Sequence, residues 1–388
     1  MTAMRHFDFL DDLDRRRLFH REPESFTATG DPDLLAVALG ATLYCPGTRP
    51  SLADDMIRRA AQGVISAVVC LEDSVADGEL EQAERNAVSQ LGLLAQSTLP
   101  RPLVFVRVRT PGQVDMIVDR LGPHRGVVSG FVLPKFDEVV GAEYLEAIAA
   151  ASGRCGQRLL AMPVLESAEV IHAETRLESL LAARRLVDKY RDHVLAVRLG
   201  ATDLSAAYGL RRSRDLTIYD SHVVADVIAD IVNVFGRADH GYVVTGPVWE
   251  YFSGAVRMFK PQLRETPFAD HDERRLRARL IARDLDGLIR EIALDRANGL
   301  TGKTVIHPSH VAPVHALSVV THEEFVDSAD VLGTAARGGV SSSAYGNKMN
   351  ESKPHAAWAR RTMLRARAFG VARPDVSFVD LLAAALER

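Results

Sequence analysis

The sequence contains few cysteines, no excess of either charge and no long apolar run. Three cysteines in 388 residues are an odd number, which excludes a small disulfide scaffold and favours reduced, buried thiols. The 47 lysines and arginines face 51 aspartates and glutamates, a net charge of -4, so the chain lacks the basic excess typical of nucleic-acid binders. No run approaches the roughly 20 apolar residues that span a bilayer. We therefore expect partners other than nucleic acids or membranes.

The first residues also lack the apolar segment of a signal peptide. Residues 1–17, MTAMRHFDFLDDLDRRR, mix acids with bases, and we expect a cytoplasmic protein. With 47% hydrophobic and 25% charged residues, the composition is that of an ordinary globular protein. The length fits either one large α/β barrel with an appendage or two ordinary domains.

Short apolar runs alternate with longer amphipathic ones from residue 40 onward. Eight runs rich in β-branched residues predict strands at 41–45, 66–72, 103–108, 127–133, 159–165, 194–200, 242–246 and 304–308. Apolar residues at three- and four-residue spacing predict helices between them, including 143–151 and 168–190. This α/β pattern matches a TIM (β/α)8 barrel. A doubly wound open sheet is the main alternative, but no G-x-G-x-x-G motif follows the first strand.

Two regions depart from the alternating pattern. Residues 247–270 form an insertion with aromatic residues and prolines after the seventh predicted strand. The glycine- and serine-rich stretch 333–355 predicts a mobile loop before a last helix at 356–369. We therefore expect three regions: an N-terminal arm (1–39), a TIM-barrel catalytic domain (40–318), and a C-terminal loop and helical lid region (319–388).

Polar residues follow the predicted strands at the end where TIM barrels build their active sites. They come from six strands and are Glu72, Asp73, Arg107, Arg109, Lys135, Glu166, Asp203 and His307. Glu166 and Asp203 are one strand–helix unit apart, so their carboxylates would be neighbours. A hard divalent cation such as Mg²⁺ would relieve their repulsion. The alternative is that each carboxylate caps a helix or pairs with an arginine.

Arg107 interrupts an apolar strand, where a guanidinium is costly unless it faces an anion. That anion is either a substrate carboxylate or, in a structural ion pair, Glu72 or Asp73. The small residues of LGATD (199–203) would allow backbone N–H groups to approach a substrate carboxylate closely.

Lys135 and His307 each leave two interpretations open. Lys135 suggests a Schiff-base aldolase, although nearby carboxylates would keep its amine protonated. His307 precedes a proline, and is either a general base or a packed residue that shapes the site.

Seven motifs together resemble a known family. They are ATLYCPGTRP, VVCLEDSVADGELEQAERN, VFVRVR, VLPKF, MPVLES, RLGATDL and GKTVIHPSHV. Their order and spacing resemble the citrate lyase β-subunit-like branch of the HpcH/HpaI aldolase superfamily, over residues 40–370. GLRRSRDLTIYD and NKMNESKPH are similar to TIM-barrel C–C bond lyases associated with bacterial tellurium-resistance gene clusters.

The resemblance implies a Mg²⁺-dependent TIM barrel, with Mn²⁺ as a substitute, that forms or cleaves a C–C bond beside a carbonyl. It implies a homotrimer or a dimer of trimers. Glu166 and Asp203 would be the metal ligands. Arg107 would bind the carboxylate and carbonyl end of a 2-oxo acid, with Glu72 and Asp73 orienting it and holding metal-bound waters.

Further substrate contacts are expected around this core. The backbone of Gly200, Ala201 and Thr202 would take the substrate carboxylate, as the resemblance implies. Lys135 and His307 complete the expected substrate-binding set.

The sequence departs from the family pattern at three places. The usual R-V-N reads Arg107-Val108-Arg109, which adds a charge. The late V-D-x-P motif, whose aspartate often enters a neighbouring subunit's site, has Asn350 instead. An amide cannot transfer a proton, so Glu351 becomes the candidate catalytic acid/base. The insertion at 247–270 falls where an acyl-CoA would bind and leaves the use of CoA open.

These observations favour a Mg²⁺-dependent lyase or aldolase that acts on a 2-oxo acid or 3-hydroxyacyl substrate, CoA thioesters included. A metal-stabilised enolate would be its intermediate. Acyl-CoA thioester hydrolysis would use the same chemistry. The alternative from another class is a non-catalytic or regulatory ligand-binding barrel in a stress-response assembly, which Asn350 favours and the Glu166–Asp203–Arg107 set disfavours.

Overall fold

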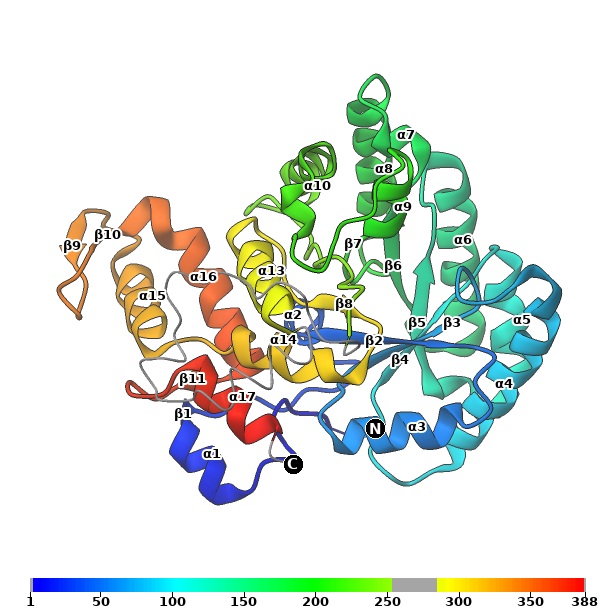
Figure 1. Cartoon of the computed structure of the whole chain (residues 1–388), viewed down its shortest axis with the longest axis horizontal. Coiled ribbons are helices and arrows are strands. Elements are labelled where there is room, and N and C mark those ends of the chain that lie inside the picture. The colour runs from blue at the N-terminus through cyan, green and yellow to red at the C-terminus, as the bar shows by residue number, and fades with distance from the viewer. Residues whose placement is uncertain (1–2, 253–284, 387–388) are drawn as a thin grey trace.

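The computed structural model describes residues 3–252 and 285–386. Its centre is a parallel seven-stranded sheet in the order β7-β6-β5-β4-β3-β2-β8, curled into a barrel wall (Figure 1). The strands are β2 Ala41–Pro46, β3 Ser66–Cys70, β4 Leu103–Arg107, β5 Val128–Leu133, β6 Leu160–Leu165, β7 Arg198–Leu199 and β8 Lys303–Val305. The predicted TIM-barrel fold is therefore confirmed.

The seventh predicted strand, 242–246, closes the barrel without forming a regular strand. It makes isolated parallel bridges to the residues around β7 and β8. The N–H of Thr245 donates to the carbonyl of Val197 at 2.9 Å, and the N–H of Thr304 donates to that of Gly246 at 3.1 Å. The segment thus fills the position of the missing strand between the two ends of the sheet.

Helices cover the outside of the sheet, as the apolar spacing predicts. They are α3 Leu52–Ala61, α4 Leu80–Gln96, α5 Gly112–Leu121, α6 Glu138–Cys155, α7 Ala168–Ile171, α8 Arg176–Lys189, α9 Ala201–Ala206, α10 His222–Phe235 and α13 Leu285–Ala297. The helix predicted at 143–151 begins earlier because the Asp137 side chain caps it. The helix predicted at 168–190 is split into α7 and α8, where the Thr175 hydroxyl donates to the carbonyl of Glu169 at 2.7 Å.

Two apolar layers hold the barrel together, one inside it and one beneath the helices. Phe105 faces the interior with Val68 and Val132, whereas Val106, next to Phe105 on β4, packs under the helices. This alternation is the period-two pattern of a strand with both faces buried. The polar residues after each strand are consequently left at one rim of the barrel.

The N-terminal and C-terminal regions fold against each other beside the barrel. The N-terminal elements are α1 Asp12–Leu18, β1 Phe19–Arg21 and α2 Pro32–Ala38. The C-terminal ones are α14 Val311–Ser318, α15 His322–Thr334, β9 Val340–Ser342, β10 Met349–Glu351, α16 Ser352–Phe369, β11 Val371–Ala372 and α17 Phe378–Leu386. Strands β1 and β11 pair antiparallel (Figure 1). Arg367 on α16 contacts Glu24 at 2.9 Å and Asp31 at 3.1 Å.

The glycine- and serine-rich stretch 333–355 is not the structureless loop that its composition predicts. It contains the end of α15, the antiparallel hairpin β9–β10 and the start of α16. The helix predicted at 356–369 begins at Ser352 and is followed by α17, so it is not the last helix. The hairpin is held by contacts to α15, which a local composition pattern does not reveal.

The remaining expectations concern segments and cysteines. Residues 253–270 of the predicted insertion lie outside the described part of the chain. Cys45, Cys70 and Cys155 are free thiols; Cys70 is buried as expected, whereas Cys45 and Cys155 are only partly buried. No helix among the described residues is long and apolar enough to cross a membrane. The three domain boundaries stay predictions.

Candidate active site

Five charged side chains meet at the rim where β3, β4, β5 and β6 end, and we call them the ionic cluster. Arg107 lies at its centre. Its Nη2 is 2.9 Å from Glu72 Oε2 and 2.8 Å from Glu166 Oε1, and its Nη1 is 3.2 Å from Asp73 Oδ2. Lys135 Nζ is 3.2 Å from Glu72 Oε1. The structure thus brings Glu72, Asp73, Arg107, Lys135 and Glu166 together.

Parallel strands place these residues at one rim because all of their carboxyl ends point the same way. Arg107 is the last residue of β4, and Glu166 directly follows β6. Lys135 has a φ of +48°, a left-handed conformation that is uncommon outside glycine. Its backbone N–H donates to Glu166 Oε1 at 3.1 Å. The turn after β5 therefore helps to hold the Glu166 carboxylate.

Asp203 lies beside the cluster without joining its ion pairs. It is on α9, which begins just after Gly200, and it is partly exposed. Among the described residues, its carboxylate makes no ion pair or side-chain hydrogen bond. Its charge nevertheless acts on Glu166: burial raises the pKa of Glu166 to about 7, Arg107 opposes this, and Asp203 adds to the increase.

The pKa values of other charged groups in the cluster are shifted for the same reasons. Burial raises the pKa of Glu72, and hydrogen bonding with Asp73 adds to the increase. Burial alone would lower the pKa of Arg107, but Glu166, Tyr44 and Glu72 outweigh it and the pKa is raised. Acidic side chains outnumber basic ones in this region even after Arg107 and Lys135 are paired. The site can therefore accept a further cation.

The donor set fits an open oxygen site and not a closed metal centre. Within residues 3–252 and 285–386, no group of three or more His, Cys, Asp or Glu side chains could hold a metal ion by itself. Glu166 and Asp203 supply carboxylate oxygens from adjacent elements. Mg²⁺ is commonly bound through one or two carboxylates, with water and substrate completing its shell. The pair has the chemistry that such an ion requires.

A cavity of about 460 Å³ opens beside the ionic cluster. Its wall includes Glu72, Arg109, Lys135, Tyr144, Glu166 and Ser167. The Ser167 hydroxyl is buried and finds no hydrogen-bond partner among the described residues, which makes it a polar group available to a bound molecule. Sequence reasoning missed Ser167, although it directly follows the predicted ligand Glu166.

Arg109, the extra charge in the R-V-R motif, supports a loop. Its Nη2 donates to the carbonyls of Val75 at 2.8 Å and Glu72 at 3.2 Å, and its Nη1 is 2.5 Å from Asp77. These contacts fasten the segment that carries Glu72 and Asp73. The departure from the family pattern therefore has a structural explanation.

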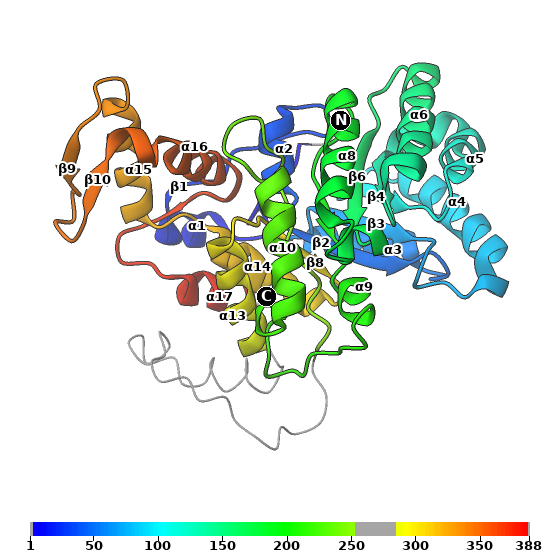
Figure 2. The same ribbon diagram turned by 90° about the horizontal axis from the view of Figure 1, so that it is seen from above.

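His307 and Glu351, both predicted site residues that the structure describes, make no contact with the ionic cluster. His307 stacks on Phe252 with ring centroids 4.7 Å apart, and its Nδ1 is 2.7 Å from the Ser309 hydroxyl. Glu351 is exposed on β10. The hairpin β9–β10 lies far from β3–β6 in both views (Figures 1 and 2). Neither residue contacts the cluster within the described chain.

The structure also shows a buried cation that sequence reasoning did not select. Arg198 on β7 is 1% exposed. Its Nη2 donates to the Thr304 hydroxyl on β8 at 2.6 Å, and its guanidinium lies 5.5 Å from the ring centroid of Tyr44. No carboxylate lies within ion-pair distance of it in the described part of the chain. The signal that identified Arg107 was also available for Arg198, because both are charged residues within an apolar predicted strand.

Comparisons with known proteins agree with this architecture. A citrate lyase structure from Burkholderia xenovorans is similar with 18% identity and a TM-score of 0.61, over 88% of this chain and 96% of that one. The magnesium/glyoxylate complex of Haloferax volcanii malate synthase has 14% identity and a TM-score of 0.50, over 71% and 73% of the two chains. These similarities show the fold.

A search of curated proteins finds no significant match. The family model for C–C bond lyases of the TIM-barrel fold matches residues 33–371. The match covers most of the chain, including every strand of the barrel and the whole ionic cluster. The chain therefore belongs to the C–C bond lyase family of the TIM-barrel fold.

Proposed function

We propose that the chain is a divalent-metal-dependent lyase or aldolase that acts on a 2-oxo acid or 3-hydroxyacyl substrate. The observation that carries the proposal is the position of Arg107 between Glu72 and Glu166, with Asp203 beside them and free of ion pairs to any described residue. The site offers an arginine to an anionic substrate and an excess of carboxylates to a cation. Membership of the C–C bond lyase family supports this assignment.

Mg²⁺ is the cation that the donor set favours, and Mn²⁺ is a substitute with similar preferences. Glu166 and Asp203 would hold it. When bound, the ion would polarise the substrate carbonyl and stabilise enolate charge. The malate synthase of similar fold is a magnesium/glyoxylate complex, and another of its structures is a pyruvate/acetyl-CoA complex. These ligands belong to the proposed classes, which include CoA thioesters.

Arg107 would bind the carboxylate of the substrate. Its Nε is buried and has no hydrogen-bond partner among the described residues, so this donor is still available after the ion pairs to Glu72, Asp73 and Glu166. Glu72 and Asp73 would orient the guanidinium and hold water. A fixed guanidinium stabilises negative charge that develops during bond cleavage without a reorganisation cost.

Further contacts would come from the rim around Arg107. The first turn of α9, Gly200 to Thr202, would direct backbone N–H groups to the substrate carboxylate. The Lys135 side chain is 57% exposed, and its ammonium would reach a bound anion. His307 would shape the pocket from the end of β8.

Proton transfer would fall to Glu351 of a second copy of the chain, because Glu351 does not reach the cluster in its own chain. This requires a homo-oligomer, such as a trimer or a dimer of trimers. The test mixes two inactive variants, Glu166→Gln and Glu351→Gln. Activity that returns on mixing supports a shared site, whereas two variants that stay inactive together exclude it.

Solvent deuterium exchange into the methyl group of pyruvate tests the lyase proposal. We expect exchange in the presence of Mg²⁺, loss of exchange with EDTA, and loss in Glu166→Gln and Asp203→Asn. Arg85→Gln is the control, since Arg85 is an exposed residue of α4 that pairs with Glu81 and does not contact the cluster or line its cavity. The proposal fails if no small 2-oxo acid shows metal-dependent exchange and Glu166→Gln binds Mg²⁺ as well as the unmodified protein does.

The other interpretations have less support. Hydrogen bonding to Glu72, together with its charge, raises the pKa of Lys135, which disfavours a Schiff-base aldolase because that chemistry needs a neutral amine. Asn350 donates to buried Asp327 at 3.0 Å, so its presence no longer favours a non-catalytic barrel. Thioester hydrolysis is tested separately by thiol release from acetyl-CoA.

A further inference from the structure

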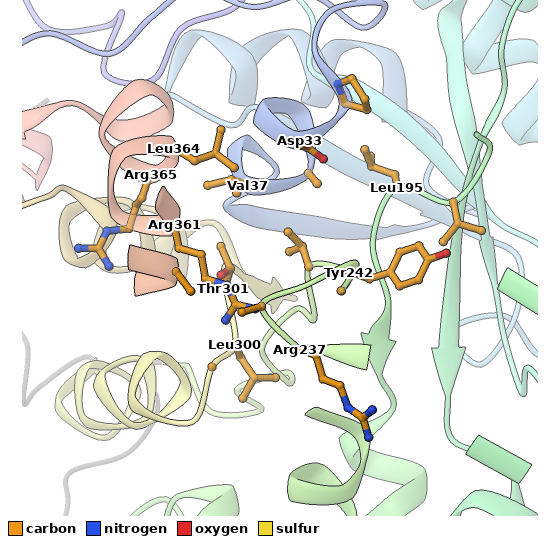
Figure 3. Close-up of a pocket in the computed structure, with 18 of the residues that line it drawn as sticks. Asp33, Val37, Leu195, Arg237, Tyr242, Leu300, Thr301, Arg361, Leu364 and Arg365 are labelled. Carbon is orange, nitrogen blue, oxygen red and sulfur yellow. The ribbon is translucent and has the colours of Figure 1, made fainter. Parts of the chain in front are cut away.

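A second cavity, of about 620 Å³, lies at the end of the barrel where the strands begin (Figure 3). Leu160, the first residue of β6, and Leu300, just before β8, belong to its wall. Helices α2 and α16 contribute further parts of the wall, among them Val37 and Leu364. The ionic cluster follows the opposite ends of the strands, so this cavity is separate from the candidate active site.

Arginines dominate the charged part of the cavity wall. Among the described residues, six arginines and three acids line it: Arg158, Arg191, Arg237, Arg296, Arg361 and Arg365, with Asp33, Asp192 and Glu324. The cavity therefore carries excess positive charge, in a protein whose net charge is -4. Such a local excess attracts anions.

Two arginines of the cavity wall share a single carboxylate. Arg365 Nη2 is 2.8 Å from Glu324 Oε2, and Arg296 pairs with the other oxygen of Glu324. Arg365 is only 15% exposed, and its Nε is buried without a hydrogen-bond partner among the described residues. Burial and the charge of Arg296 lower the pKa of Arg365. The two guanidinium groups are thus paired with only one negative charge, that of Glu324.

Two more arginines reach the cavity without an acidic partner in the described residues. Arg361 Nη2 donates to the carbonyl of Gly236 at 2.5 Å, and Arg237 Nε donates to that of Asn233 at 2.6 Å. Figure 3 shows Arg361 extending from α16 toward Thr301, with Arg237 on the other side. Neutral carbonyls orient both side chains and leave their positive charges uncompensated.

The rest of the wall is apolar and aromatic. Leu195, Leu300 and Leu364 provide apolar surface, and Tyr242 adds an aromatic ring (Figure 3). Trp358 lies three residues before Arg361 on α16 and is 38% exposed, so both face the same side of the helix. The volume is in the range of small-molecule sites. An occupant would need both an anionic group and an apolar or aromatic body.

We propose that this cavity binds a phosphorylated organic molecule of nucleotide size, with its phosphate among Arg361, Arg365 and Arg296. Guanidinium groups match phosphate oxygens in geometry and charge. The organic body would pack against the leucines, Tyr242 and Trp358. Binding would join the C-terminal helix α16 to the start of the barrel strands, away from the ionic cluster.

Calorimetric titration of the full chain with ADP, pyrophosphate and adenosine tests the proposal. We expect saturable binding of ADP, weaker binding of pyrophosphate and none of adenosine. Arg361→Met should weaken ADP binding by about tenfold or more, because an Arg–phosphate contact is lost. Arg360→Met is the matched control: it neighbours Arg361 on α16, is exposed and does not line the cavity.

Three results would overturn the proposal. The first is no binding of ADP or pyrophosphate at millimolar concentration. The second is equal ADP affinity of Arg361→Met and the unmodified protein, with both showing the same thermal unfolding. The third is loss of ADP binding in Glu166→Gln, which would place the ligand at the ionic cluster instead. These results do not depend on lyase activity.

Discussion

Gly200 lies so close to Glu166 that a Cβ atom at residue 200 would stand 1.9 Å from Glu166 Oε2 and 2.4 Å from Glu166 Cβ. The φ of Gly200 is -91°, which any residue adopts, so space and not backbone conformation requires glycine here. The side chain after β6 thus packs directly on the backbone after β7. This contact joins the cluster residue Glu166 to the turn that leads to Asp203.

Replacing Gly200 with alanine should displace the Glu166 carboxylate. We expect a loss of about 1–3 kcal/mol in the free energy of unfolding, as for other over-packed sites, together with weaker Mg²⁺ binding. Urea denaturation and metal titration measure the two effects. Gly112→Ala is the control, because nothing lies within 4 Å of its added Cβ. Unchanged metal affinity in Gly200→Ala would show that the contact does not position a ligand.

Arg107→Met should destabilise the fold strongly. It leaves Glu72 and Glu166 buried without their shared cation, and breaking a buried ion pair costs about 3–5 kcal/mol. Adding Glu166→Gln to Arg107→Met should recover part of the loss, since one uncompensated charge disappears. Urea denaturation of the two single variants and the double variant measures this coupling. Strict additivity would mean that the two residues do not interact energetically.

Asn350→Asp should loosen the hairpin β9–β10. Asn350 is buried and its amide donates to Asp327 Oδ1 at 3.0 Å. An aspartate at residue 350 would therefore place its buried carboxylate against that of Asp327. We expect a loss of about 1–3 kcal/mol at pH 7, with faster amide hydrogen exchange in the hairpin. The double variant Asn350→Asp/Asp327→Asn, in which the two side chains exchange positions, restores a donor opposite an acceptor and should regain stability. If the double variant is no better than the single variant, this hydrogen bond does not hold the hairpin.

His6 and His315 should each contribute a loss of stability as the pH is lowered below about 6.5. Burial lowers the pKa of His6 to about 4 and that of His315 well below its usual value. The unfolded chain protonates both rings near pH 6.5, so between pH 6.5 and 4 it binds more protons than the folded chain. The free energy of unfolding then decreases by up to about 1.4 kcal/mol per pH unit for each ring.

The contacts of the two rings explain why protonation is unfavourable. Their centroids are 4.5 Å apart, and the N–H of Ala41 donates to His315 Nε2 at 3.2 Å, which requires an unprotonated nitrogen. His6→Phe should therefore reduce the pH dependence in urea denaturation between pH 7.5 and 5. His172→Gln, at an exposed position, should leave it unchanged. If the free energy of unfolding depends on pH equally in His6→Phe and in the unmodified protein, His6 is not a source of the pH dependence.

Local patterns in the sequence predicted the barrel and most of its site. Apolar runs such as 41–45 and 103–108 correspond to β2 and β4 because a strand buried on both faces needs apolar residues throughout. Arg107 and Glu166 were identifiable because charge at the end of such a run is costly without a partner. The rule that parallel strands end at one rim then brought them together.

Other residues could not be assigned before the chain was folded. Arg109 and Asn350 resembled departures from a catalytic pattern, yet each makes hydrogen bonds within the structure. Glu351 was selected by its place in a motif, but the hairpin carries it away from the cluster of its own chain (Figure 1). In each case the deciding partner is distant in sequence or belongs to another element.

The sequence by itself determined the repeating βα pattern, the charges at the strand ends and the family resemblance. Only the tertiary structure decided how segment 242–246 closes the barrel, how β1 pairs with β11, and where six arginines gather around one cavity. The spacing of apolar residues indicates which face of a helix or strand is buried, because that spacing is a local property of the sequence. It does not report which elements meet, because those contacts depend on the packing of the whole chain.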